Sequence, residues 1–147
     1  MRLTRFTDYS LRVLIYLGQN NQSRVTINQI SEAYDISKNH LMKVVSNLTR
    51  SKFVVAQRGP GGGIQLNRLP EDISLNEVIA ITEKHLQQLD VAIPADSSEL
   101  TADNRLSGYL QHALQAYLEA LACFTLADVL EPQAEAAQLL NLNEKAA

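Results

Sequence analysis

The chain has 147 residues, of which 46% are hydrophobic and 20% are charged. The length suggests one domain with an extension, and the composition is that of a globular protein and not of an intrinsically disordered chain. No apolar run approaches the roughly 20 residues of a membrane-spanning helix. The N-terminus goes straight into Arg2, Arg5 and Asp8, so we expect no signal peptide. The single cysteine excludes an internal disulfide framework. We therefore expect a cytoplasmic protein.

The net charge of −3 conceals an uneven distribution. Residues 1–68 contain ten lysines and arginines against three acidic residues, a balance of +7. Residues 69–147 contain three lysines and arginines against thirteen acidic residues, a balance of −10. A basic half beside an acidic half is the asymmetry expected when only the basic half faces nucleic acid.

The first 25 residues predict a helix followed by a polar loop. The helix covers residues 4–18, begins at Thr4 or Thr7, and carries Asp8 in its first turn, where a carboxylate complements the helix dipole. Its apolar side consists of Phe6, Tyr9, Val13, Leu14 and Leu17. After the loop, Val25 is expected to form a short strand against a later hairpin.

Two further helices follow, joined by a short turn. Thr26 and Gln29 have the spacing of a capping box, which satisfies backbone N–H groups at a helix start. The helix that they begin is expected to bury Ile30, Ala33 and Tyr34.

The second helix of the pair follows a turn at Asp35-Ile36, with Ser37 as a suitable N-cap. Its apolar residues recur on one face and are Leu41, Val44, Val45 and Leu48. The opposite face contains no acidic residue and consists of Asn39, His40, Lys43, Ser46, Asn47 and Arg50. Asn and Ser hydrogen-bond to base edges or phosphates, whereas Lys and Arg neutralise phosphate charge.

A hairpin with a glycine-rich tip completes this half. Phe53 with Val55, and Ile64 with Leu66, predict two strands on either side of residues 57–63. A helix pair with such a hairpin is typical of a winged helix-turn-helix, whose second helix enters the major groove. The wing then follows the flanking backbone or minor groove. The alternative is an ordinary helical hairpin with a solvated polar face. The DNA contacts predicted are Thr26, Ser37, Lys38, Asn39, His40, Lys43, Asn47, Arg50, Arg58, Gly59, Gly61 and Gly62.

The remaining chain predicts helices around a long loop. Ser74 and Glu77 have capping-box spacing, and their helix completes a winged domain over residues 1–83. Residues 87–103 lose the helical period, and we interpret residues 84–103 as a sensor-like loop. Loops of that length in small domains are usually functional or disordered. Residues 104–131 predict a long amphipathic helix and a short capped helix, and residues 132–147 a tail.

The long helix has more apolar surface than packing on one small domain requires. We therefore expect a dimerisation helix that contacts its symmetry mate. The alternative is an internal core helix of a monomer. The interface residues expected are Leu106, Leu110, Ala113, Leu114, Tyr117, Leu118, Leu121 and Phe124. The fold class predicted is mainly α with a small β-wing.

Four segments together resemble one family of bacterial regulators. They are FTDYSLR at residues 6–12, ISKNHLMKVVSNL at 36–48, RGPGGGI at 58–64 and FTLADVL at 124–130. They are similar to motifs of the NsrR/IscR-type winged-helix transcriptional regulators. The resemblance implies a homodimer that binds a palindromic operator, with swapped long helices at the dimer interface.

The chain departs from that family in its cysteines. Cluster-bearing members hold an iron–sulfur cluster through three cysteine thiolates before the long helix. The positions that correspond to them are Ile93, Ser98 and Asn104, and none is cysteine. Asp8 matches a carboxylate that completes cluster ligation in some members, but one carboxylate does not hold a cluster. Cys123 lies outside the motif and is expected to be a packing residue, so we expect no metal site and no cofactor.

The sequence thus predicts a dimeric, sequence-specific DNA-binding transcriptional regulator, a repressor without the family's cluster. One alternative keeps the DNA-binding half under the control of a small ligand or a partner protein. Another is a winged-helix protein-interaction module that does not bind DNA. We do not expect an enzyme, because the sequence has no Ser-His-Asp arrangement or paired carboxylates, and its glycine run lies between strands and not before a helix.

Overall fold

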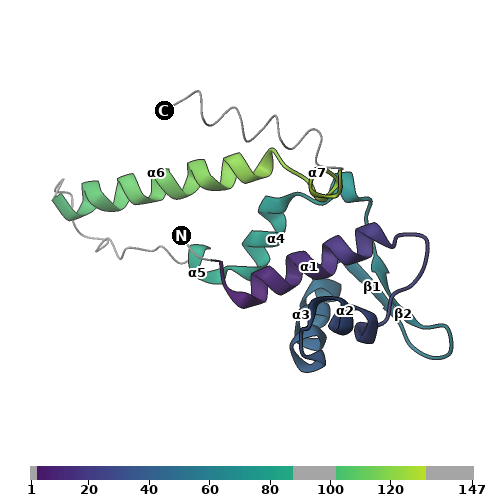
Figure 1. Cartoon of the computed structure of the whole chain (residues 1–147). Coiled ribbons are helices and arrows are strands. Elements are labelled where there is room, and N and C mark those ends of the chain that lie inside the picture. Colours follow the sequence, from purple (N-terminus) through teal and green to yellow (C-terminus); the bar gives the residue numbers. More distant parts are fainter. Residues whose placement is uncertain (1–2, 88–101, 132–147) are drawn as a thin grey trace.

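The computed structural model describes residues 3–87 and 102–131, which are mainly helical with one two-stranded sheet. In Figure 1, α1, α2 and α3 gather beside the β1–β2 wing, and the long α6 lies on the far side of α4. The predicted fold class, mainly α with a small β-wing, is confirmed.

Three helices form the N-terminal bundle, namely α1 (Arg5–Gln19), α2 (Ile27–Tyr34) and α3 (Lys38–Arg50). Each begins at a side chain that accepts a hydrogen bond from a backbone N–H three residues later. The three caps are Thr4, Thr26 and Ser37. The turn between α2 and α3 holds Asp35 in the left-handed region, with φ of 51°.

The core lies where the three helices meet. Its buried apolar residues in the bundle are Val13, Leu14, Leu17, Ile30, Ile36, Leu41, Val44, Val45 and Leu48. All four apolar residues predicted for α3 are therefore buried. The prediction for Ala33 is wrong, because this residue is exposed. The short α2 packs through Ile30, with Tyr34 only partly covered.

The wing is an antiparallel hairpin of β1 (Val54–Gln57) and β2 (Gly63–Leu66). Val25 pairs with Ile64 in an isolated bridge, as predicted. The face predicted for the first strand is wrong by one residue, since Val54 is buried and Val55 is 40% exposed. Phe53 before β1 and Val54 at its start are both buried, and the other three residues of β1 are exposed, so the strand does not show the predicted alternation.

A 3-10 turn, η1 (Pro70–Asp72), and α4 (Leu75–Thr82) follow the wing. The predicted capping box is wrong, because the Ser74 side chain makes no capping hydrogen bond. Glu77 instead accepts a hydrogen bond from Arg68, with 2.8 Å between Oε2 and Nη2. The same guanidinium lies 4.4 Å from the ring centroid of Phe53. Glu77 therefore joins α4 to the base of the wing.

Three helices complete the described chain, namely α5 (Lys84–Gln87), α6 (Ala102–Ala122) and α7 (Leu126–Leu130). The first four residues of the expected 84–103 loop are thus helical, and α6 begins two residues before 104. Thr125 caps α7 in a capping box with Asp128. α7 packs on α1 and η1, while α4 lies between α1 and α6. The predicted tail at 132–147 lies outside the described residues.

Within residues 3–87 and 102–131, no helix combines the length and apolar character that crossing a membrane requires.

Candidate nucleic-acid interface

The outward face of α3 carries the side chains that the sequence assigns to DNA. Asn39, Lys43 and Arg50 are exposed there and line an open groove of about 670 Å³. The other lining residues are Phe6, Met42, Ser46 and Asn47. None of these residues is acidic, so a negatively charged ligand meets no repulsion from the groove lining.

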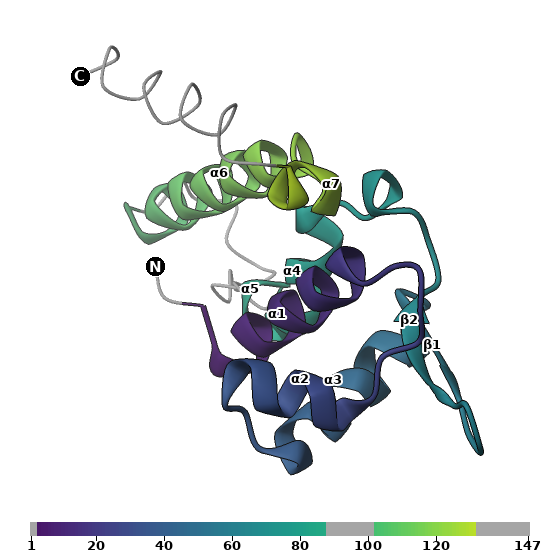
Figure 2. The same ribbon diagram turned by 45° about the vertical axis from the view of Figure 1, so that its right-hand side comes forward.

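The basic side chains of this face are available to a ligand. Lys43 and Arg50 on α3 and Arg58 on the wing are exposed, and none makes an ion pair with a carboxylate of the described residues. Lys38 is exposed in the first turn of α3. In Figures 1 and 2 the tip of the β1–β2 wing projects away from the helices. The arrangement provides separate positive charges on a helix and on a projecting loop, which suits a phosphate backbone.

The polar residues at the helix starts are engaged in caps. The Ser37 hydroxyl accepts from the backbone N–H of His40 and lies 3.2 Å from His40 Nδ1. The exposed His40 ring lies near Tyr9 of α1, with 6.0 Å between ring centroids. The Thr26 hydroxyl accepts from the N–H of Gln29 and donates to its Oε1 at 3.0 Å. Ser37 and Thr26 therefore fix the starts of α3 and α2.

The wing tip depends on its glycines for its shape. Gly59 and Gly61 have φ values of 95° and 71°, in the left-handed region that glycine adopts without strain. A Cβ at Gly62 would lie 2.5 Å from the carbonyl oxygen of Gln57. The Gly62 N–H donates to the carbonyl of Gly59 at 2.8 Å. These glycines shape the turn that follows Arg58.

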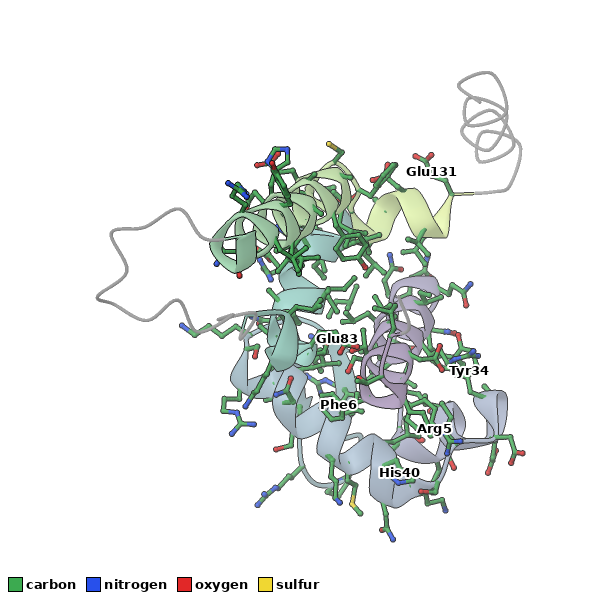
Figure 3. The ribbon with its side chains drawn as sticks, turned by 90° about the vertical axis from the view of Figure 1, so that its left-hand side faces the viewer. Arg5, Phe6, Tyr34, His40, Glu83 and Glu131 are labelled. Carbon is green, nitrogen blue, oxygen red and sulfur yellow. The ribbon has the colours of Figure 1, made fainter. Side chains whose placement is uncertain are left out.

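Two residues of the groove were missed in the sequence reasoning. Met42 is 51% exposed on α3, and Phe6 reaches the groove from α1. A signal for Met42 is present in the sequence, because it lies off the apolar face that Leu41 and Val44 define. Figure 3 shows Phe6 and His40 at the end of the molecule away from α6.

The residues at the ligand positions of the family's iron–sulfur cluster do not suit such a cluster. The Asp8 carboxylate pairs with Arg12, with 3.0 Å between Oδ2 and Nε, and this hydrogen bond raises the pKa of the Arg12 guanidinium. The predicted packing role of Cys123 is wrong, because it is exposed after the last turn of α6. Ile93 and Ser98 lie outside the described residues, as does the side chain of Asn104. One cysteine in the chain is too few for a cluster held by three thiolates.

The part of the chain that the structure describes contains no group of three His, Cys, Asp or Glu residues placed to hold a metal ion.

The long helix α6 leaves much apolar surface uncovered. Leu106, Tyr109 and Leu110 are 57%, 71% and 45% exposed, and Phe124 beyond its end is 37% exposed. Of the other predicted interface residues, Ala113 is exposed, and the half-buried ones are Leu114, Tyr117, Leu118 and Leu121. Tyr109 was not among the predicted interface residues. Leu106, Tyr109 and Leu110 lie three and four residues apart, so they share one exposed side of α6.

The capped helix pair, the wing and the acid-free face of α3 define a winged helix-turn-helix protein. The chain belongs to the Rrf2 family, whose profile, described as an iron-dependent transcriptional regulator, matches residues 3–132. It is 40% identical over 149 residues to the HTH-type transcriptional regulator NsrR of Bacillus subtilis (strain 168), covering 98% of this chain and 100% of that protein. It is also 40% identical over 144 residues to NsrR of Bacillus licheniformis, covering 96% and 100%.

Solved structures show the same fold. Superposition on IscR of T. potens gives a TM-score of 0.72 at 22% identity, covering 92% of this chain and 90% of that one. CymR, the global cysteine regulator of B. subtilis, gives 0.71 at 21% identity, covering 88% and 96%. The predicted class, a winged-helix transcriptional regulator, is confirmed by the family match.

Proposed function

We propose that this protein is a dimeric, sequence-specific DNA-binding repressor that works in the cytoplasm without an iron–sulfur cluster and without catalysing a reaction. The observation that carries the proposal is the face of α3. The groove on this face is lined by Asn39, Lys43 and Arg50, among others, and by no acidic residue. The face lies within residues 1–68, whose net charge is +7.

In this proposal α3 enters the major groove. Lys43 and Arg50 neutralise phosphates, and the amides of Asn39 and Asn47 contact base edges. The Oδ1 atom of Asn47 is buried and has no hydrogen-bond partner among the described residues. A base that presents a donor would satisfy this oxygen once the amide turns toward it. Arg58 lies in the flanking minor groove.

The dimer forms through α6. The exposed Leu106, Tyr109 and Leu110 on this helix pair with the same residues of a second copy, since twofold interfaces are self-complementary. Two copies of α3 then contact two half-sites about one helical turn (~34 Å) apart, and the operator is a palindrome.

The cluster-free state is testable by its colour. Protein purified without oxygen is expected to contain no stoichiometric iron and to show no visible absorption band, because the chain has one cysteine. A brown, iron-containing sample would show that other residues supply the ligands and would contradict this part of the proposal.

DNA binding is tested by a gel-shift assay with the DNA upstream of the protein's own gene. We expect a shifted complex that survives excess unrelated DNA. An absence of any specific complex would favour a winged-helix module that contacts another protein. Transcription from that DNA in the presence of the protein distinguishes repression from activation.

In a second candidate function, a small ligand controls binding to the operator. An open groove of about 550 Å³ lies between the wing base and α4, and Phe53, Arg68 and Ile81 are among its lining residues. Glu77, in the same lining, already pairs with Arg68, so the groove suits a small, mainly apolar ligand. Thermal-shift screening against such compounds tests this candidate, and a hit must also change the affinity for the operator.

A further inference from the structure

Met42 is an apolar residue placed on the wrong face of α3 for a core residue. Its side chain is 51% exposed, whereas Leu41 and Val44 beside it are 0% exposed. The packing face of α3 is already complete without Met42, because all four of its predicted residues are buried. Met42 therefore does not serve the core that the structure describes.

The surroundings of Met42 are polar and basic. It lines the groove over α3 together with Lys43, Ser46 and Arg50, and with the amides of Asn39 and Asn47. An apolar side chain in such a place gains free energy when a ligand covers it, because apolar surface is removed from water. Methionine also adapts to irregular surfaces through its unbranched, polarizable side chain.

A ligand that matches this groove is anionic at its edges and carries an apolar spot. The major groove of DNA has this combination, because phosphates border it and thymine presents a C5-methyl group inside it. We propose that Met42 recognises the C5-methyl group of a thymine in the operator half-site. This inference rests on the proposed DNA-binding function and adds a base preference to it. Phe6, which lines the same groove from α1, adds apolar surface to it.

The test replaces single thymines of the operator by deoxyuridine, which lacks only the methyl group. A site is first selected from random double-stranded DNA with the full-length protein, and its affinity is measured at fixed salt. At one thymine in each half-site, the replacement is expected to weaken binding by about fourfold, the contribution of one buried methyl group. The same replacement should leave the affinity of Met42→Ala unchanged.

Two further variants control for packing and for folding. Met42→Leu keeps an apolar side chain and should retain the loss at that thymine. Leu69→Ala removes another apolar side chain, which is 60% exposed on the segment after the wing. This variant should show the same loss of affinity at that thymine as the unmodified protein. Circular dichroism and thermal unfolding establish that each variant is folded.

The outcomes separate this inference from the proposed function. If the unmodified protein selects no DNA site, the proposed function fails. If it selects a site but every thymine replacement acts equally on the unmodified protein and on Met42→Ala, the regulator stands and the role of Met42 is overturned.

Discussion

The carboxylate of Glu83, at the C-terminal end of α4, accepts a hydrogen bond from the hydroxyl of Thr7 in α1, 76 residues earlier. The same oxygen accepts from the backbone N–H of Thr4 at 2.6 Å. Glu83 is 1% exposed and Thr7 is 0% exposed. Figure 3 shows Glu83 beside α1, between His40 and α6. Because α4 packs on both α1 and α6, these bonds join the N-terminal helical bundle to the helix that supports α6.

Removing the Thr7 hydroxyl should therefore destabilise the fold. Thr7→Val keeps the shape of the side chain but takes a donor from a buried carboxylate, which costs about 1–3 kcal/mol. Urea unfolding followed by circular dichroism measures the loss. Thr7→Ser keeps the hydroxyl and should lose much less. Equal stability of Thr7→Val and the unmodified protein would show that this bond contributes nothing.

The capping box of α7 gives the stability an acid-sensitive component. Asp128 accepts from the backbone N–H of Thr125 at 2.6 Å and from its hydroxyl at 2.8 Å. These bonds, the backbone one first, hold the pKa of the Asp128 carboxyl below its ordinary value. A carboxyl whose pKa is lowered by folding stabilises the folded state at neutral pH. That contribution is lost as the pH falls through its folded-state pKa.

Asp128→Asn should therefore flatten the acid side of the stability curve. Because Asp128 is exposed, the change is small, but its direction is defined. Urea midpoints of the unmodified protein and the variant should differ near neutral pH and converge below about pH 4. Two parallel curves over this range would contradict the assignment.

The sequence was sufficient to predict the helices of the N-terminal bundle, because caps and apolar spacing involve residues that are close together in the chain. Thr26 and Ser37 cap helices through residues three positions away, and the apolar face of α3 follows from a single period. Sequence spacing did not predict the hydrogen-bond partner of a side chain that can reach either a nearby or a distant residue. Glu77 has the spacing of a capping box but pairs with Arg68, nine residues away across the wing base.

The candidate site shows the same limit. The acid-free face of α3 and the wing tip that contains Arg58 can be predicted from the sequence, since each belongs to one continuous segment. The contributions of Phe6 and Tyr9 to the α3 surface were missed, because they depend on how α1 crosses α3. The exposure of Cys123 depends on how α6 lies on α4, and the helical period of α6 alone does not determine that orientation.

The wing tip should not tolerate a side chain at Gly62. A Cβ there would lie 2.5 Å from the Gln57 carbonyl oxygen and 2.7 Å from that of Gly59. Both contacts are with backbone, so Gly62→Ala must reshape the turn after Arg58. We expect operator affinity to fall at least as far as in Arg58→Ala, with the thermal unfolding midpoint nearly unchanged.

Gly108→Ala is the matched control for that substitution. Gly108 is in α6, and nothing lies within 4 Å of an added Cβ. This change should stabilise the helix by up to about 1 kcal/mol and leave DNA affinity unaltered. Unchanged operator binding by Gly62→Ala would remove the wing from the DNA contacts.

A charge in the exposed face of α6 should separate the dimer. Leu110 is 45% exposed in the chain described here, so Leu110→Glu costs the isolated chain little while burying a carboxylate in the proposed interface. Sedimentation should give a folded monomer, and operator affinity should fall because only one half-site is bound. Gln111→Glu, which adds the same charge at an exposed neighbouring position outside the predicted interface set, should remain a dimer. Dimers in both variants would place the interface elsewhere.

The salt dependence of operator binding should report on Lys43. If its ammonium group neutralises a phosphate, Lys43→Ala releases one fewer counterion per subunit, and the slope of log K against log salt becomes shallower by about one for each half-site. Lys84→Ala removes an exposed lysine from α5 in the acidic half and should leave the slope unchanged. A Lys43→Ala variant that weakens binding equally at every salt concentration would instead assign Lys43 to a base edge, because such a contact releases no counterion.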